Sequence, residues 1–152
     1  MFINSLREIL SYAESRNLNF CIENNVAASF NQSSDGTNPF LCAEPDEINF
    51  VLDKVSSNNL HLLLDTAHLK VSSITLNFDL DSAVKKIIQK ALVLHHSDND
   101  GHVDSNSPIG KDYWFSKYFK SLPNPHYHVL EVKAIGINKI KSQLNLLKSF
   151  IE

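Results

Sequence analysis

Four short apolar runs, each ending in an acid or a histidine, dominate the pattern of hydrophobic and polar positions along the chain. In Leu60–Asp65 a leucine-rich stretch stops abruptly at the acid, and the other runs end at Glu23, His95 and Glu131. Runs this short and this apolar neither form amphipathic helices nor cross a membrane, and they are typical of buried parallel strands. The pattern therefore predicts four strands, at about residues 18–23, 60–65, 91–96 and 127–131.

Amphipathic segments predict helices around these strands. They cover residues 5–15, a segment from Pro45 to about Asn58, a segment from Asp79 or Asp81 to Lys90, residues 112–121, and a segment from about 138. In the last helix we expect a buried stripe of Ile140, Leu144, Leu147 and Ile151. Residues 69–78 lack a regular pattern, and we expect irregular chain there.

The order of elements is one helix followed by four strand–helix units. Alternation of this kind predicts an α/β fold with a parallel sheet and right-handed crossovers. The carboxyl ends of parallel strands meet at one rim, so the side chains of Glu23, Asp65, His95 and Glu131 can converge there. Alternation along the third strand sends only one of His95 and His96 toward that rim. The pattern alone leaves a doubly wound sheet and a barrel both open.

Composition narrows the class of protein. With 152 residues and 43% hydrophobic content, the chain is expected to form one domain over residues 1–152. A net charge of −3 and a pI near 6.1 give no strong attraction to nucleic acid or to anionic membranes. Cys21 and Cys42 show no metal or redox spacing, and no signal or membrane segment is evident. We therefore expect a cytoplasmic protein without nucleic-acid or membrane partners.

Three carboxylates and one imidazole around one point form a donor set for a divalent metal ion. Oxygen-rich sets of this kind suit Mn²⁺, Mg²⁺ or Co²⁺ better than a structural Zn²⁺. Two carboxylates on either side of a substrate carbon can also move a proton, as aldose–ketose isomerisation and epimerisation require. For each acid taken singly, a helix cap or a solvated charge is the plainer explanation. His68, three residues after Asp65, has a similar alternative, a hydrogen bond to the loop backbone.

Five segments at the predicted strand ends and the loops that follow them carry a family pattern: Ile22–Asn25, Leu64–Leu69, His95–Asp98, the loop Gly101–Gly110, and Leu130–Val132. Together they resemble the xylose isomerase-like barrel superfamily, which contains sugar and sugar-phosphate isomerases, ketose 3-epimerases and nucleases of the endonuclease IV type. The segments follow the family order and cover nearly the whole chain.

The resemblance implies roles for particular residues. Glu23, Asp65, His95 and Glu131 would be the metal ligands, and Glu23 and Glu131 would also act as the acid/base pair. The implied substrate is a sugar or sugar phosphate, contacted by His68, Asp98 and Asp104.

Two departures from the family pattern bear on function. The nuclease loop holds another zinc with an Asp and, two residues later, a His, whereas this chain has Asp104 and Asn106. A complete barrel needs eight strands and about 250 residues, so four strands imply only the C-terminal half of a (β/α)8 barrel. We therefore expect a homo-oligomer or an N-terminal half-barrel partner. The leading interpretation is a metal-dependent isomerase or epimerase; a phosphodiester hydrolase and an inactive half-barrel remain the alternatives.

Overall fold

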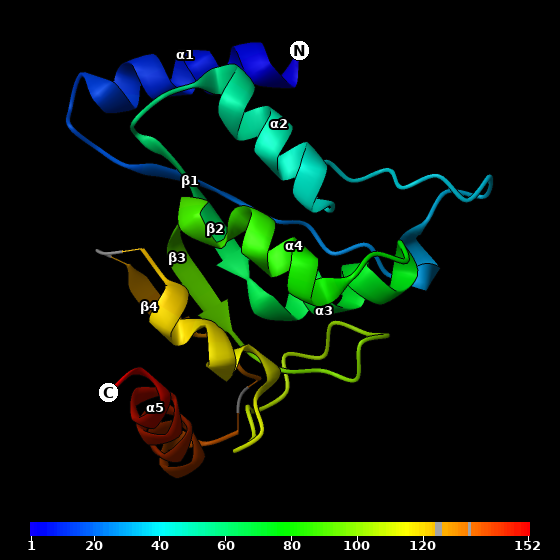
Figure 1. The fold of residues 1–152 in the computed structure, drawn as a ribbon, viewed down its shortest axis with the longest axis vertical. Helices are drawn as coiled ribbons and strands as arrows, with labels where there is room; N and C mark the ends of the chain where they lie inside the picture. Colours follow the sequence, from blue (N-terminus) through cyan, green and yellow to red (C-terminus); the bar gives the residue numbers. More distant parts are fainter. Residues whose placement is uncertain (124–125, 134) are drawn as a thin grey trace.

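The computed structural model describes residues 1–123, 126–133 and 135–152, and it contains one four-stranded parallel sheet (Figure 1). The strands are β1 (Phe20–Glu23), β2 (Leu60–Asp65), β3 (Ala91–His96) and β4 (Tyr127–Leu130). Their spatial order is β1-β2-β3-β4, the same as their order along the chain. A doubly wound sheet would reverse its strand order at a switch point, whereas barrel strands follow one another without reversal. The predicted α/β half-barrel is confirmed.

Helices follow the strands as the alternation predicts. They are α1 (Phe2–Glu14), α2 (Pro45–Val55), α3 (Thr66–Thr75), α4 (Leu80–Ile87) and α5 (Ile137–Ile151), with 3-10 segments η1 (Ser29–Asn31), η2 (Ile88–Lys90) and η3 (Trp114–Ser121). Pro45 begins α2 at its first turn, as predicted. Asp79 caps α4 by accepting a hydrogen bond from the backbone N–H of Ser82.

The prediction of irregular chain at residues 69–78 is wrong, because α3 begins at Thr66 and continues to Thr75. Its first turn is capped by the Asp65 side chain, which accepts a hydrogen bond from His68 N. Apolar and hydroxyl side chains are buried on several sides of this helix, so its sequence carries no amphipathic stripe.

The predicted burial of α5 is wrong for three of its four residues. Leu147 is buried, but Ile140, Leu144 and Ile151 are 37–42% exposed. The helix packs against η3 through Phe150, which stacks on Phe119 with ring centroids 6.1 Å apart. That contact fixes which side of α5 faces the core, and it leaves the adjacent apolar side uncovered.

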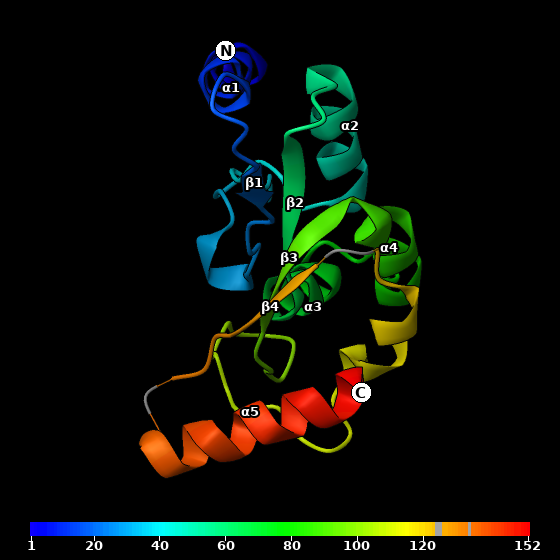
Figure 2. The same cartoon turned by 90° about the vertical axis from the view of Figure 1, so that its left-hand side faces the viewer.

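The two faces of the sheet differ in what they contact. Leu62 and Leu94 are fully buried in the core that the sheet shares with α2 and α4 (Figure 2). Leu63, Val93 and Tyr127 are neighbours in register, so their side chains share the other face, which would line the inside of a barrel. No helix in the described residues is long and apolar enough to cross a membrane.

Candidate metal centre

The four residues singled out at the strand ends come together at one rim of the sheet. Glu23 and Asp65 are the last residues of β1 and β2, His95 is the penultimate residue of β3, and Glu131 follows β4. Each offers one ligand atom, and these atoms lie within 4.8 Å of one another. The predicted convergence is therefore present, while metal binding by these residues stays a prediction.

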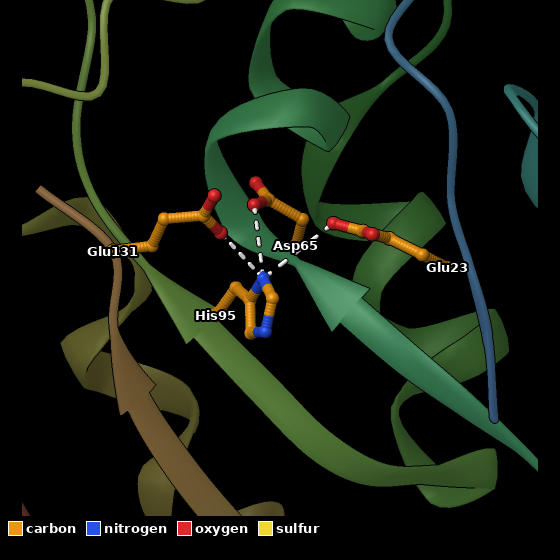
Figure 3. Close-up of side chains that lie close together, drawn as sticks. All are labelled: Glu23, Asp65, His95 and Glu131. Carbon is orange, nitrogen blue, oxygen red and sulfur yellow. Dashed lines mark ion pairs between the residues drawn. The ribbon is translucent and has the colours of Figure 1, made fainter. Parts of the chain in front are cut away.

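The cluster is centred on the imidazole of His95 (Figure 3). Its Nδ1 lies 2.5 Å from Glu131 Oε2, 3.5 Å from Glu23 Oε1 and 3.8 Å from Asp65 Oδ2. The carboxylates come from the ends of β1 and β2 and from the residue after β4. One small volume therefore receives oxygen atoms from several directions.

Two atoms in this volume are buried without a hydrogen bond. Among the described residues, His95 Nδ1 and Glu131 Oε2 have no partner of suitable geometry, although they are the closest pair in the cluster. A buried polar atom without a partner costs about 1–3 kcal/mol. Atoms that converge without hydrogen-bonding one another are what a set of ligands aimed at a common cation would present. The donor set therefore fits a divalent metal ion.

Electrostatics within the cluster are strongly coupled. Burial raises the pKa of Asp65 to about 6, although the nearby His68 imidazole acts to lower this pKa. The carboxylate of Glu23 raises the pKa of His95, and His95 in turn lowers the pKa of Glu23. A dication placed among three carboxylates would favour their charged forms and oppose the burial effect on Asp65.

Asn24 fixes the rim where β1 meets β2. Its side chain donates to the backbone O of Asp65 (3.0 Å) and accepts from the backbone N–H of Asp65 (2.7 Å). Both residues are buried. In the sequence, Asn24 stands out only as part of the Ile22–Asn25 segment, and no local signal shows that its partner is the backbone of residue 65.

His68 and Asp104 lie beside the cluster. His68 Nδ1 is 2.9 Å from the backbone O of Asn24, and Nε2 is 3.2 Å from Asp104 Oδ2. Burial alone lowers the pKa of His68, but Asp104 and Asp65 outweigh it and raise that pKa to about 9. The imidazole is therefore charged at neutral pH. Asp104 Oδ1 is buried with no hydrogen-bond partner among the described residues.

Asp98 takes a different position from the other predicted substrate contacts. Its carboxylate accepts from Lys70 Nζ at 2.7 Å, and its backbone pairs with Ser107 in an isolated bridge. Asp98 therefore stabilises the loop that follows β3, and it is not one of the four converging residues.

A chain of hydrogen bonds that the sequence analysis missed runs behind the rim. Thr66 Oγ1 donates to the backbone O of His95 at 3.0 Å, and its oxygen lies 2.6 Å from the Tyr113 hydroxyl. Tyr113 in turn contacts His96 Nδ1 at 3.0 Å, and His96 Nε2 lies 2.8 Å from His128 Nδ1. His96 is fully buried on the face opposite to His95, as strand alternation predicts.

Comparisons with known proteins agree with this fold. A family model described as xylose isomerase-like TIM barrel matches residues 1–150. The chain is similar to the crystal structure of a D-tagatose 3-epimerase-like protein, with a TM-score of 0.73 and 18% identity over 98% of this chain and 52% of the other. It is also similar to the probable 3-DHS dehydratase AsbF, involved in petrobactin synthesis in Bacillus anthracis, with a TM-score of 0.61 and 15% identity over 97% of this chain and 55% of the other.

Both solved structures are about twice as long as the part that this chain matches, so the chain spans about half of each. Among curated proteins, none is similar enough in sequence to count as a match.

Proposed function

Because this chain belongs to the xylose isomerase-like TIM barrel family, we propose that its rim cluster binds one divalent metal ion and serves the isomerisation or epimerisation of a sugar or sugar phosphate. The chain spans half of the related barrels, so we assign this activity to the barrel that the chain forms with another half. The ligands in this proposal are Glu23, Asp65, His95 and Glu131.

One observation carries the proposal: the ligand atoms of Glu23, Asp65, His95 and Glu131 converge within 4.8 Å, and two of these atoms are buried without hydrogen bonds. Ordinary rim charges would be solvated or hydrogen-bonded. Three oxygen donors and one imidazole favour Mn²⁺, Mg²⁺ or Co²⁺ over the thiolate-rich sites of structural zinc. When bound, such an ion polarises a carbonyl or hydroxyl of the substrate as a Lewis acid.

Glu23 and Glu131 are the proposed acid/base pair. They extend from the two outer strands, β1 and β4, toward His95 from its two sides. The lowered pKa of Glu23 keeps its carboxylate ionised and able to accept a proton at neutral pH. A carbon held between the two groups could lose a proton to the ionised carboxylate on one face and receive a proton from a protonated carboxyl on the other, which inverts that carbon.

His68 and Asp104 are the proposed substrate contacts. Both ring nitrogens of His68 already have partners, so this residue would offer positive charge and hold Asp104 in place. Asp104 Oδ1 is buried and has no hydrogen-bond partner among the described residues, so a substrate hydroxyl that reached it could donate to it. The prediction that Asp98 contacts substrate has weaker support, because its carboxylate binds Lys70.

Metal content tests the proposal directly. Elemental analysis after dialysis against Mn²⁺ should give one ion per chain, and Glu131→Gln should reduce binding at least tenfold. Asp46→Asn is the matched control, because it removes an exposed carboxylate of α2 that pairs with Lys86 and is not one of the converging ligands. Equal metal content in all three proteins would contradict the proposed ligand set.

Solvent exchange tests the reaction. In deuterated water, the metal-loaded protein should introduce deuterium at the carbon next to the carbonyl of a ketose, measured by proton NMR over a panel of sugars and sugar phosphates. Two or three zinc ions per chain with cleavage of abasic DNA would instead support the phosphodiester hydrolase. A bound ion without exchange in the assembled barrel would support the inactive half-barrel.

A further inference from the structure

Three buried polar residues share one position relative to the rim, because each directly follows the proposed ligand on its strand. They are Asn24 after β1, Thr66 after β2 and His96 at the end of β3. All three are fully buried, with 0% of their surface exposed. A buried polar group costs free energy unless it is hydrogen-bonded, so the bonds of these residues explain why they are tolerated at the rim.

Two of these residues use their side chains to hold the backbone of the next ligand. Asn24 donates to the backbone O of Asp65 at 3.0 Å and accepts from its N–H at 2.7 Å. Thr66 Oγ1 donates to the backbone O of His95 at 3.0 Å. Because β1 and β2 have just ended at these points, each side chain supplies a bond that a longer strand would have made.

His96 is connected to two ligands at once. Its backbone O accepts from Glu131 N at 3.0 Å. Its Nδ1 lies 3.0 Å from the hydroxyl of Tyr113, which lies 2.6 Å from Thr66 Oγ1. His96 therefore binds Glu131 directly and reaches His95 through two hydroxyl groups. The residue after each of three ligands thus holds the backbone of the next ligand, from β1 across to β4.

Counting hydrogens gives the direction of the chain that reaches His95. The Thr66 hydroxyl has one hydrogen, and a backbone carbonyl can only accept, so this hydrogen goes to His95 O. The contact between Thr66 and Tyr113 then requires Tyr113 to donate. The Tyr113 oxygen has no second hydrogen, so it accepts from His96 Nδ1–H. A hydrogen on His96 Nδ1 is therefore the signature of a chain that ends on His95 O.

The side chains behind the rim are fixed by packing as well as by hydrogen bonds. Phe115 and Phe119 lie beside the His96 ring, with ring centroids 6.1 and 5.6 Å away, and Tyr113 is 1% exposed. His96 Nε2 also lies 2.8 Å from His128 Nδ1. Supporting residues that are locked in this way can hold a site in a precise geometry.

We propose that Thr66 is a positioning residue for His95. Its hydroxyl, oriented by Tyr113 and His96, holds the end of β3 so that the imidazole of His95 faces the other three ligands. Thr66 itself contacts neither metal nor substrate in this role. The proposal rests on the proposed function, because it assigns a task within the same site. It does not depend on a second half-barrel, because the whole chain of bonds is buried within the described residues.

The affinity for Mn²⁺, measured by isothermal titration of the folded protein, tests this role. Thr66→Val keeps the size of the side chain but removes the hydroxyl, and it should weaken binding by about 10–100-fold. Thr66→Ser keeps the hydroxyl and should bind almost as tightly as the wild type. Ser73→Ala is the matched control, because it removes a buried hydroxyl of α3 whose bond, to Lys70 O at 2.7 Å, stays within the helix. This control should leave the affinity unchanged.

The outcomes separate this proposal from the proposed function. Equal affinity of the wild type and Thr66→Val would overturn the positioning role and leave the metal site standing, whereas a wild type that binds no divalent ion would overturn both. If Thr66→Val does not fold, Tyr113→Phe takes its place. That change removes the group that orients the Thr66 hydroxyl, so it should weaken binding by a smaller factor, and an unchanged affinity would again overturn the role.

The position of the hydrogen on His96 tests the chain without any metal. Long-range proton–nitrogen NMR of the wild type should find this hydrogen on Nδ1. A bare Nδ1 would require Tyr113 to donate to His96 and Thr66 to donate to Tyr113. Thr66 would then have no hydrogen for His95 O, and this result would overturn the proposal even if the protein binds a metal ion.

Discussion

Replacing Asn24 with alanine should destabilise the protein more than any other single polar-to-alanine change at the rim. The side chain is fully buried and makes two hydrogen bonds to the backbone of Asp65, at 2.7 and 3.0 Å. Alanine leaves one buried N–H and one buried C=O without partners, and each such group costs about 1–3 kcal/mol. We expect a loss of about 2–6 kcal/mol, a large part of the 5–15 kcal/mol typical of a whole domain.

Urea unfolding measures this loss, with every variant at the same protein concentration so that any association acts at equal concentration in each. Asn25→Ala is the matched control, because the neighbouring amide makes one bond to Leu41 O and the residue is exposed; its expected cost is below about 1 kcal/mol. If Asn24→Ala does not fold, Asn24→Asp, which keeps the acceptor for Asp65 N–H, should retain part of the stability. A loss below about 1 kcal/mol for Asn24→Ala would refute the reasoning.

Three further changes test other parts of the structure. Tyr113→Phe removes the hydroxyl that contacts Thr66 and His96, and it should lower the free energy of unfolding by about 1–3 kcal/mol, whereas Tyr12→Phe on the surface should change it by less than about 0.5 kcal/mol. Burial lowers the pKa of His128 to about 4 from an ordinary value of 6.5, so between these pH values the unfolded chain binds a proton that the folded chain does not. Stability should therefore fall as the pH falls through this window, and less steeply in His128→Gln; parallel curves would contradict the assignment. Burial and Glu47 raise the pKa of Cys42 to about 11, so iodoacetamide should not label this residue at pH 7.5 until urea unfolds the chain, and rapid labelling of the folded protein would be the contrary result.

The strands and their common rim could be predicted because the information is local. A short apolar run ending in an acid needs no distant partner to be recognised, and parallel strands bring their ends together whatever the details of packing. Glu23, Asp65, His95 and Glu131 could therefore be named as a group.

The parts that could not be predicted depend on distant contacts. Helix α3 is buried on several sides, so its sequence lacks the stripe by which surface helices are recognised. In α5, periodicity identified an apolar side correctly, but only the contact with η3 determines how much of that side is covered. The roles of Asn24 and Tyr113 likewise depend on partners 41 and 47 residues away along the chain.

The carboxylate of Asp65 divides its two oxygens between two tasks, and this affects how the chain can change over evolutionary time. Oδ1 caps α3 through His68 N, while Oδ2 faces His95. A lineage that had stopped using the site would still be selected to keep Asp65, because losing it would uncap a helix of the core. The side chains of Glu23 and Glu131 are 41% and 43% exposed, and neither caps a helix. Retention of these two glutamates would therefore report use of the rim more directly than retention of Asp65.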